Sequence, residues 1–367
     1  MRKWLTLFAT CVLALGVAAC GSDSKSSGGS SGGGGGTKLG GSINGAGATF
    51  PQPVYEEWGA AFKEKAGTTV NYQGIGSGGG IAQFTAGTVD FGATDAAMTD
   101  EELAAATKKK GEPVHIPSVF GAVTISYNLE GQKSGLKLDG ATAADMYLGK
   151  IKKWNDPAIA MQNSGTKLPD QDITVCHRSD ESGTTKLFTT FLADYSPAWK
   201  KGPGVDKTVK WPTGTGAKGN DGVAGCVKQN KGAVGYVEQA FALQNGFTTA
   251  AVKNKTGAYI TPSLASTSAA GEGITVPADL RFDSINAPGP KAYPIASATF
   301  LLAYQDMCKA GMAPAKAKLV KAWLGYATGD GQKVAPKIQY GPLPSALLSK
   351  AKAKVAGLQC NGKPIKG

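Results

Sequence analysis

The stretch Ser42-Ile43-Asn44-Gly45-Ala46-Gly47-Ala48-Thr49-Phe50-Pro51 combines a short strand, residues 42–44, with a glycine-rich turn and the start of a helix. Pro51 suits the first turn of a helix, where its missing N–H costs nothing. Val54 and Trp58 follow at helical spacing and would share one buried face. The folded part of the chain therefore opens with a strand–turn–helix unit.

The same alternation continues along the chain. Residues 68–72 are rich in β-branched side chains and predict a strand. The glycine-rich segment 74–80 leads into a short predicted helix at 81–86, and residues 89–92 predict another strand. Strands that alternate with helices in this way form a mainly parallel sheet covered by helices.

Two apolar, strand-like runs divide the chain into lobes. The run 119–128 leaves the first α/β unit, and the run 292–304 returns to it. Between them lies a second unit, with predicted strands at 173–176 and 233–237 and a helix at 183–195. We therefore predict an α/β fold of two lobes, each a mostly parallel sheet flanked by helices, joined by two hinge strands with a cleft between them. The predicted boundaries are residues 42–124 and 292–367 for lobe 1 and residues 125–291 for lobe 2.

The N-terminus predicts export. Arg2 and Lys3 precede a short apolar run that ends in Val17-Ala18-Ala19-Cys20. Such a run is short for a bilayer span, and small residues before a cysteine are typical of a bacterial lipobox. We expect residues 1–19 to be a signal peptide and Cys20 to carry the lipid. The alternative is an ordinary signal peptide with an incidental cysteine.

Residues 20–41 are almost all Gly and Ser, so they cannot bury apolar surface and predict a flexible tether. About 325 of the 367 residues remain, enough for two domains. No later segment is long and apolar enough to cross a bilayer. The protein is expected to be extracytoplasmic and lipid-anchored to the bacterial cell membrane, in the periplasm or on the cell surface.

Four cysteines remain in the folded part, and an even number in an oxidising compartment predicts two disulfides. Three pairings are possible. We favour Cys176 with Cys226 and Cys308 with Cys360, because each pair then stays within one neighbourhood of the sequence. A metal site is less favoured, since none of the four lies in a CxxC pair.

The chain carries a formal net charge of +12, concentrated at its C-terminal end. Residues 309–367 contain 11 Lys against one acid, Asp330. A solvated basic face explains this best, although such a face could also steer small anions toward a cleft. Nucleic-acid binding is disfavoured because the mature chain has only two arginines, Arg178 and Arg281, and no aromatic-interleaved basic stripe.

Three segments share a glycine-rich turn, a hydroxyl side chain and a helix start: residues 47–51, residues 76–80 and residues 182–185. The N-terminus of a helix presents unpaired N–H groups and a partial positive charge, which favour an anion. Each segment alone is explained by an ordinary helix cap. Three of them in a chain that also needs a cleft predict an anion site.

Arg178 and Asp95 give this site its chemical character. A guanidinium can make two parallel bonds to a tetrahedral oxyanion, and Asp180 is near enough in sequence to orient Arg178. An ionised Asp95 only accepts hydrogen bonds, so it would repel sulfate and accept the proton that phosphate retains near neutral pH. Asp95 therefore predicts selectivity for phosphate. The alternatives are a surface ion pair for Arg178 and an ordinary turn residue for Asp95.

Several motifs closely resemble those of the phosphate-binding proteins of ABC phosphate importers. They are residues 45–51 (GAGATFP), 71–77 (NYQGIGS), 89–95 (VDFGATD), 147–154 (YLGKIKKW), 218–222 (KGNDG) and 232–238 (GAVGYVE). The resemblance runs in order from about Gly45 to Phe300. It implies a type II periplasmic-binding-protein fold, in which the anion lies between two lobes.

Carried over motif by motif, the resemblance implies that phosphate is held by hydroxyls, N–H groups, one carboxylate and one arginine: Thr49, Phe50 (by its N–H), Ser77, Asp95, Arg178, Ser182, Gly183 and Thr184. It also implies delivery of phosphate to the permease subunits of an ABC importer. We expect a monomer with no cofactor and no metal. Two positions depart from the family pattern: Gly78 follows Ser77 where a second serine is common, and Glu181 stands where a glycine is common.

Other functions compete with this one. Residues 74–79 fit the pattern GxGxxG of dinucleotide-binding enzymes, but a lone match is weak and an exported lipoprotein is poorly placed to use such a cofactor. A surface phosphatase is disfavoured because neither His115 nor His177 lies in a nucleophile–base pattern. A binding protein for another oxyanion is disfavoured by Asp95, and an adhesin would leave the three helix starts unexplained. We therefore expect a binding protein and not an enzyme.

Overall fold

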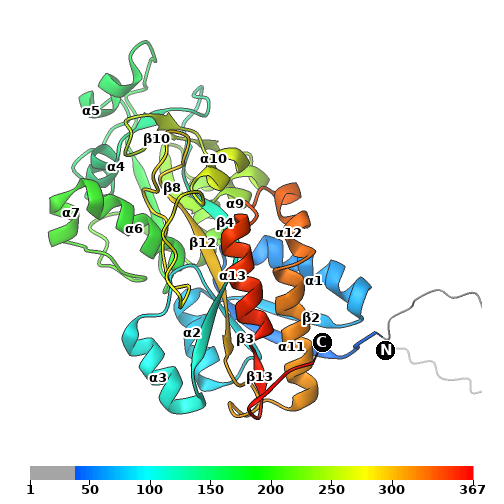
Figure 1. Cartoon of the computed structure of the whole chain (residues 1–367). Coiled ribbons are helices and arrows are strands. Elements are labelled where there is room, and N and C mark those ends of the chain that lie inside the picture. The colour runs from blue at the N-terminus through cyan, green and yellow to red at the C-terminus, as the bar shows by residue number, and fades with distance from the viewer. Residues whose placement is uncertain (1–37, 367) are drawn as a thin grey trace, which may run out of the picture. The chain divides into compact units, whose positions relative to one another are not determined.

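One long β-sheet runs through the residues that the computed structural model describes, 38–366 (Figure 1). Its strand order is β2-β1-β3-β12-β4-β8-β6-β7, with the short β9 beside β4. Its strands are β1 (Ser42–Gly47), β2 (Thr69–Gly74), β3 (Phe91–Thr94), β4 (Pro113–Asn128), β6 (Thr174–Arg178), β7 (Thr215–Ala217), β8 (Ala233–Glu238), β9 (Thr248–Thr249) and β12 (Ala296–Tyr304). Two small sheets consist of β5 (Lys137–Leu138), β10 (Ala251–Lys253) and β11 (Tyr259–Ile260), and of β13 (Gln359–Cys360) and β14 (Lys363–Pro364).

Parallel strands lie at both ends of the long sheet and antiparallel strands in its middle. β1 pairs in parallel with β2 and β3, and β6 pairs in parallel with β7 and β8. β12 is antiparallel to β3 and β4, and β4 is antiparallel to β8. The predicted α/β class is confirmed, but the strands form one mixed sheet and not two separate parallel ones.

The length of β4 explains this difference. Its 16 residues serve two partners, since Pro113–Ala122 pair with β12 and Val123–Asn128 pair with β8. Every residue of β4 except Asn128 is buried, so its sequence reads as a nearly continuous apolar run. The prediction began this strand only at residue 119, because Pro113 and Pro117 interrupt the strand pattern before it.

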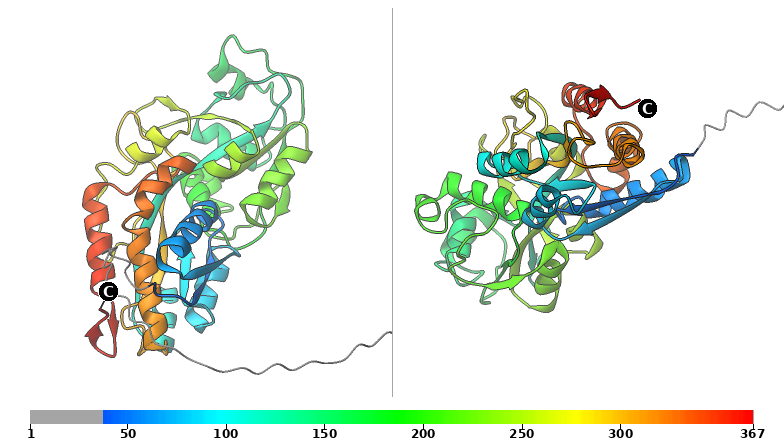
Figure 2. Two further views of the ribbon diagram at one scale, coloured as in Figure 1. Left: turned by 90° about the vertical axis from the view of Figure 1, so that its right-hand side faces the viewer. Right: turned by 90° about the horizontal axis from the view of Figure 1, so that it is seen from below.

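Helices flank the sheet, and α11 and α13 stand side by side (Figure 2). An aromatic cluster joins α1 to α11, with the Trp323 ring centroid 6.2 Å from that of Trp58 and 5.7 Å from that of Phe62. The helices are α1 (Gln52–Ala66), α2 (Ser77–Ala86), α3 (Asp100–Lys110), α4 (Gly140–Tyr147), α5 (Pro157–Ala160), η1 (Met161–Asn163), α6 (Gly183–Tyr195), α7 (Pro197–Lys201), α8 (Gly219–Gln229), α9 (Gln239–Gln244), α10 (Leu264–Ala269), α11 (Pro314–Ala327), α12 (Gly331–Val334), η2 (Ala335–Ile338) and α13 (Ser345–Ala356).

Close packing explains why β1 extends through residues 45–47, which the sequence suggested as a turn. A Cβ atom at Gly45 would lie 2.1 Å from Cζ of Phe91 in β3, so only glycine lets the two strands pair here. Other boundaries also differ from the prediction, among them the strand expected at 292–304, which is Ala296–Tyr304. The helix expected at 81–86 begins at Ser77, and the strand expected at 89–92 is Phe91–Thr94.

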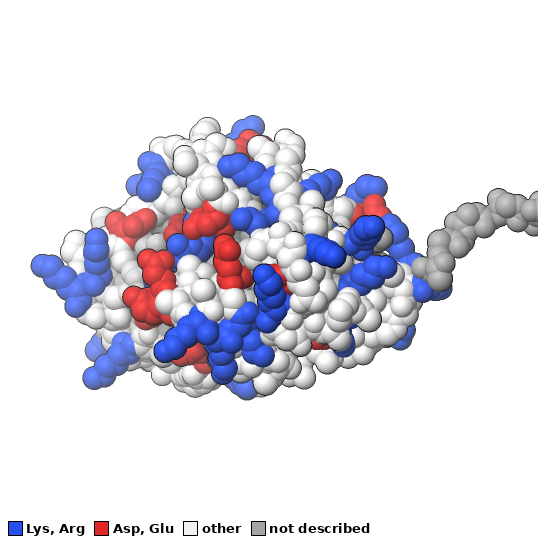
Figure 3. All heavy atoms as spheres, turned by 60° about the horizontal axis from the view of Figure 1, so that its bottom comes forward, with Lys and Arg blue, Asp and Glu red and all other residues white. Residues whose placement is uncertain are grey.

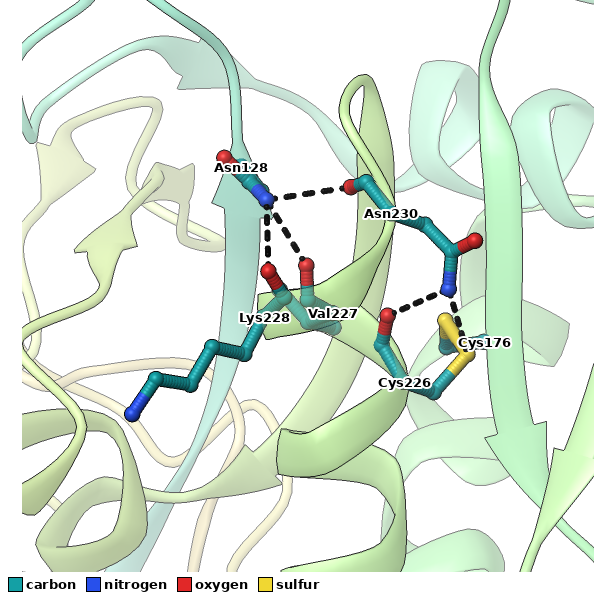
Figure 4. The surroundings of a disulfide bond; sticks show 6 residues. All are labelled: Asn128, Cys176, Cys226, Val227, Lys228 and Asn230. Atoms are coloured by element: carbon teal, nitrogen blue, oxygen red, sulfur yellow. Dashed lines mark hydrogen bonds between the residues drawn. A yellow bond between two sulfur atoms is a disulfide. The ribbon is translucent and has the colours of Figure 1, made fainter.

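Both disulfides join the cysteines that sequence neighbourhood favoured, Cys176 to Cys226 and Cys308 to Cys360. The first ties β6 to α8, as Figure 4 shows. Near it, the side-chain amide of Asn128 donates to the carbonyl oxygens of Val227, Lys228 and Asn230 at 3.0, 3.2 and 3.1 Å. The C-terminal end of α8 is therefore fixed to β4 as well as to β6.

The lysine-rich C-terminal region includes lysines that pair with acids. Lys333 contacts Asp330, which Lys65 of α1 also contacts, and Lys316 Nζ lies 3.4 Å from Asp90. On the face drawn in Figure 3, acidic side chains lie among the lysines and arginines. This mixture of charges fits a solvated surface.

The predicted signal peptide, Cys20 and most of the predicted tether lie outside the described residues. Of the predicted tether, residues 38–41 are described, and the N–H groups of Leu39 and Gly40 donate to the carbonyl of Ala66 at the end of α1. Within residues 38–366, no helix combines the length and the apolar character that crossing a membrane requires.

Candidate anion site

The predicted helix starts meet at one place, where hydroxyl and N–H groups from distant segments touch. The Ser77 hydroxyl oxygen, at the start of α2, accepts hydrogen bonds from the N–H of Gly183 at 3.1 Å and from the N–H of Asp95 at 3.2 Å. The N–H of Gly78 donates to the carbonyl of Glu181 at 3.0 Å. The start of α2 therefore lies against the start of α6, although about 100 residues separate them in sequence.

Thr49, in the segment just before α1, contacts the start of α8. Its buried hydroxyl oxygen accepts hydrogen bonds from the side-chain amide and the backbone N–H of Asn220, at 2.8 and 3.1 Å. The same amide lies 3.4 Å from the hydroxyl oxygen of Thr184 in α6. Four helix N-termini, of α1, α2, α6 and α8, therefore converge, and their N–H groups and partial positive charges favour an anion.

Asn220 was not among the predicted ligands. Its motif, residues 218–222, contributed to the family resemblance but carried no assigned role. The side chain is fully buried, and its amide oxygen accepts the N–H of Glu238 at 2.8 Å. Asn220 therefore fixes the positions of the Thr49 and Thr184 hydroxyls through its side-chain amide.

Phe50 offers its backbone to the site. Its ring is fully buried, and its carbonyl oxygen accepts the hydroxyl of Tyr340 at 2.7 Å. Among residues 38–366, the Phe50 N–H has no hydrogen-bond partner. Ser182 instead caps α6, because its hydroxyl accepts the N–H of Thr185 at 3.0 Å, which is the ordinary role of a serine before a helix.

Arg178, at the end of β6, has a side chain that is only 1% exposed. Its Nε and Nη2 donate to the two carboxylate oxygens of Asp180 at 2.7 and 2.5 Å, as the sequence suggested. Burial alone would raise the pKa of Asp180, but the bonds and charge of Arg178 hold that pKa below its ordinary value. Nη1 lies 3.4 Å from the hydroxyl of Thr184, so the pairing with Asp180 directs it toward that residue.

Asp95 is the acid of the site and is 2% exposed. Its Oδ1 accepts the hydroxyl of Thr299 in β12 at 2.9 Å. Burial raises the pKa of Asp95 to about 7, against the lowering effects of Thr299 and Arg178. A Cβ atom at Gly183 would lie 2.8 Å from Oδ2 of Asp95, so only glycine allows this close approach of α6.

The two departures from the family pattern face each other. A Cβ atom at Gly78 would lie 1.8 Å from Oε2 and 2.4 Å from Cβ of Glu181. A side chain at position 78 therefore competes with Glu181 for the same space, and the glycine and the glutamate are linked. All eight residues that the sequence singled out lie in this cluster, while Asn220 and Thr299 were missed.

A polar site at converging helix N-termini on an α/β sheet is typical of proteins that bind small anions. The relatives that this chain resembles belong to the same class. Residues 32–330 match the family model described as PBP superfamily domain, so the chain belongs to that superfamily. The phosphate-binding protein PstS of Pasteurella multocida is 42% identical over 316 residues, which cover 85% of this chain and 89% of that protein. The PstS protein of Haemophilus influenzae is 42% identical over 318 residues, which cover 85% and 92%. Within the superfamily, the chain belongs to the PstS family of phosphate-binding proteins.

Solved structures support the fold. A high-affinity periplasmic phosphate-binding protein, solved with phosphate bound, superposes with a TM-score of 0.71 at 24% identity, covering 85% of this chain and 93% of that one. A phosphate-binding protein from Stenotrophomonas maltophilia superposes with a TM-score of 0.66 at 22% identity, covering 88% and 99%. The described residues therefore have the α/β fold of periplasmic phosphate-binding proteins.

Proposed function

We propose that this protein captures inorganic phosphate outside the cytoplasm and delivers it to the permease subunits of an ABC phosphate importer. One observation carries the proposal: four helix N-termini and Arg178 lie in one polar cluster with the buried carboxyl group of Asp95, which favours an anion with a proton to share. The names of the PstS relatives support the same ligand. The protein acts by binding and carries out no reaction.

The proposed ligands come from both predicted lobes. Lobe 1 contributes two hydroxyls, one N–H and the acid, from Thr49, Ser77, Phe50 and Asp95. Lobe 2 contributes the arginine and the start of α6, namely Arg178, Ser182, Gly183 and Thr184. Strands β4 and β12 would act as the two hinge strands that join lobe 1 (residues 42–124 and 292–367) to lobe 2 (residues 125–291). Closure would exclude water and strengthen each charge-assisted bond.

The lipid anchor belongs to the same proposal. Val17-Ala18-Ala19-Cys20 supports lipidation of Cys20, and the Gly/Ser composition of residues 20–37 supports a tether that lets the binding domain reach its permease. Metabolic labelling with a fatty acid tests this: the wild-type protein should carry the label and Cys20→Ala should not. Equal labelling of both proteins would exclude lipidation at Cys20.

Calorimetric titration of the full-length protein tests the function. Phosphate should bind tightly and sulfate at least about a hundredfold more weakly at pH 8, because sulfate leaves Asp95 facing a charge without a proton. Arg178→Ala should weaken phosphate binding by at least about tenfold, since a buried charge-assisted pair is lost. Lys210→Ala, which removes an exposed cation, is the matched control and should change nothing. Comparable affinities for the two anions, or an unchanged Arg178→Ala variant, would contradict the proposal.

A further inference from the structure

The carboxyl group of Glu238 is buried at the end of β8, where β4 changes partners. Glu238 pairs with Val123, the first residue of β4 to leave β12 for β8, and is fully inaccessible to solvent. A Cβ atom at Gly121 would lie 3.3 Å from its Oε1. No lysine, arginine or histidine of the described residues forms an ion pair with it. An ionised carboxylate here would be an uncompensated buried charge.

The hydrogen bonds around the Tyr340 hydroxyl require that the carboxyl group of Glu238 carries a proton. Oε2 of Glu238 accepts the N–H of Ala240 at 2.7 Å and lies 2.8 Å from the Tyr340 hydroxyl. The same hydroxyl lies 2.7 Å from the carbonyl oxygen of Phe50. A hydroxyl has one proton, and the carbonyl oxygen can only accept. Tyr340 therefore donates to Phe50, and the second contact requires a proton from Glu238.

Glu238 is connected to the anion site by two routes. Through Tyr340 it holds the carbonyl of Phe50, whose N–H is a proposed phosphate donor. Through its backbone N–H it holds Asn220, whose amide in turn donates to Thr49. The glutamate belongs to the segment 125–291, yet it fixes both residues of the Thr49–Phe50 pair in the segment 42–124.

We propose that Glu238 is a positioning residue that bears a proton and fastens the Thr49–Phe50 half of the site to the segment 125–291 when the protein closes on phosphate. This inference rests on the proposed function. Opening the lobes would separate these contacts, so the protonated form of Glu238 belongs to the closed arrangement.

The acid–base properties of the cluster agree with this geometry. Burial raises the pKa of Glu238 to about 8, despite the hydrogen bonds that Tyr340 and Ala240 could donate to its ionised form, and the nearby Asp95 raises it further. Tyr340 and Asp95 are the titratable groups that act on it, and burial raises the pKa of Tyr340 as well. If opening returns the pKa of Glu238 toward its ordinary value, closure takes up a proton. The closed form is then stabilised less and less as the pH rises toward about 8, and its stability relative to the open form stays constant above that pH.

Titration of phosphate across pH 6 to 9 with the full-length wild-type protein and Glu238→Gln tests the inference. The glutamine is neutral at every pH, so the ratio of its affinity to that of the wild type should rise by at least about tenfold across this range and level off at the top. Glu272→Gln, which removes an exposed carboxylate, is the control and should keep a constant ratio. A constant ratio for Glu238→Gln as well would overturn the proposal.

Infrared spectroscopy gives a second readout that does not need phosphate affinity. The infrared difference spectrum of the wild-type protein minus Glu238→Gln at pH 7 should contain a carboxylic acid C=O band, which the difference spectrum of the wild type minus Glu272→Gln should lack. Asp95 is also partly protonated at this pH, and its band cancels in both difference spectra. Tyr340→Phe should shift this band, since it removes the hydroxyl that receives the proton. Absence of the band from the difference spectrum of the folded wild type minus Glu238→Gln would overturn the proposal. If phosphate fails to bind at all, the proposed function fails, while the band still decides the protonation of Glu238.

Discussion

At the residue scale, Asp95 is the proposed determinant of which anion binds. With its pKa raised by burial to about 7, the group is largely a neutral acid at pH 6 and largely a carboxylate at pH 8. A neutral acid can donate to sulfate, whereas a carboxylate repels it. Selectivity against sulfate should therefore narrow as the pH falls through about 7.

Asp95→Asn should remove this pH dependence. The amide donates a hydrogen bond and carries no charge, so the sulfate affinity of the variant at pH 8 should exceed that of the wild type by at least about tenfold. The variant should also bind sulfate equally well at pH 6 and at pH 8. Calorimetric titration of sulfate at the two pH values measures both effects. Sulfate binding by the variant that stays as weak as in the wild type would show that Asp95 does not set selectivity.

Gly78 and Glu181 form the second residue-scale case. Gly78→Ser should destabilise the fold by about 1–3 kcal/mol and weaken phosphate binding, because the new Cβ overlaps both ends of the Glu181 side chain. The double variant Gly78→Ser with Glu181→Gly should recover both properties. Thermal unfolding and calorimetry measure them, and Gly225→Ser, at an open position of α8, is the control. A single variant as stable as the wild type would refute this steric link.

The set of proposed ligands also belongs to this scale. Glycine-rich helix starts and Arg178 are visible in sequence and predicted an anion site, and the family resemblance then named the eight predicted ligands. Asn220 and Thr299 could not, because an amide in a helix and a threonine in a strand have no distinctive local pattern. Only their burial against Thr49 and Asp95 reveals what they do.

At the scale of elements, the start of α3 is held by two cations from the segment 125–291. Lys207 contacts one carboxylate oxygen of Glu102, and the other oxygen accepts the Thr99 N–H in a capping box. Arg281 donates to Asp100 at 2.8 Å. Because α3 follows Asp95 closely in sequence, these contacts brace the loop that carries the acid. The Lys207 carbonyl also accepts the Ser182 N–H at 2.9 Å, at the start of α6.

Lys207→Met should therefore speed the release of phosphate by about three- to tenfold, since a largely buried ion pair between the two segments is lost. Lys231→Met is the matched control, because Lys231 pairs with Glu130 within one segment and both side chains are about 80% exposed. Displacement kinetics with a competing anion measure the rates. Equal release rates for the two variants would show that the contact of α3 with Lys207 does not govern opening.

Elements were predicted better by kind than by extent. The helix at 183–195 has clear caps and apolar periodicity, and α6 has the same bounds. Strand β4 was shortened in prediction because its prolines mimic a boundary, although in the sheet Pro117 lies next to a register shift between β4 and β12. A strand's partners decide how far it extends, and they are distant in sequence.

For the whole molecule, the two buried acids predict how stability depends on pH. The pKa of Asp95 rises from 3.8 to about 7 on folding and that of Glu238 from 4.5 to about 8, so the folded state holds protons that the unfolded state releases. Stability should fall as the pH rises through this window. Burial lowers the pKa of His115 to about 4, which opposes the trend only below pH 6.5.

Thermal unfolding without phosphate should therefore show a lower midpoint at pH 8 than at pH 6.5. The loss should amount to a few kcal/mol at most, and it should nearly vanish in the double variant Asp95→Asn with Glu238→Gln. A wild-type midpoint that is unchanged or higher at pH 8 would contradict the raised pKa values of both acids.

The sequence by itself determined the α/β class, the predicted export signal, the candidate anion chemistry and the family, because these depend on local patterns of glycine, hydroxyl, charge and apolar residues. Only the tertiary structure decided that β4 and β12 merge the parallel strands into one mixed sheet, that four helix starts meet, and that Glu238 reaches Phe50 through Tyr340. The reason is physical: burial and hydrogen bonding between residues far apart in the chain create the shifted pKa values and the shared protons, and no local pattern encodes them.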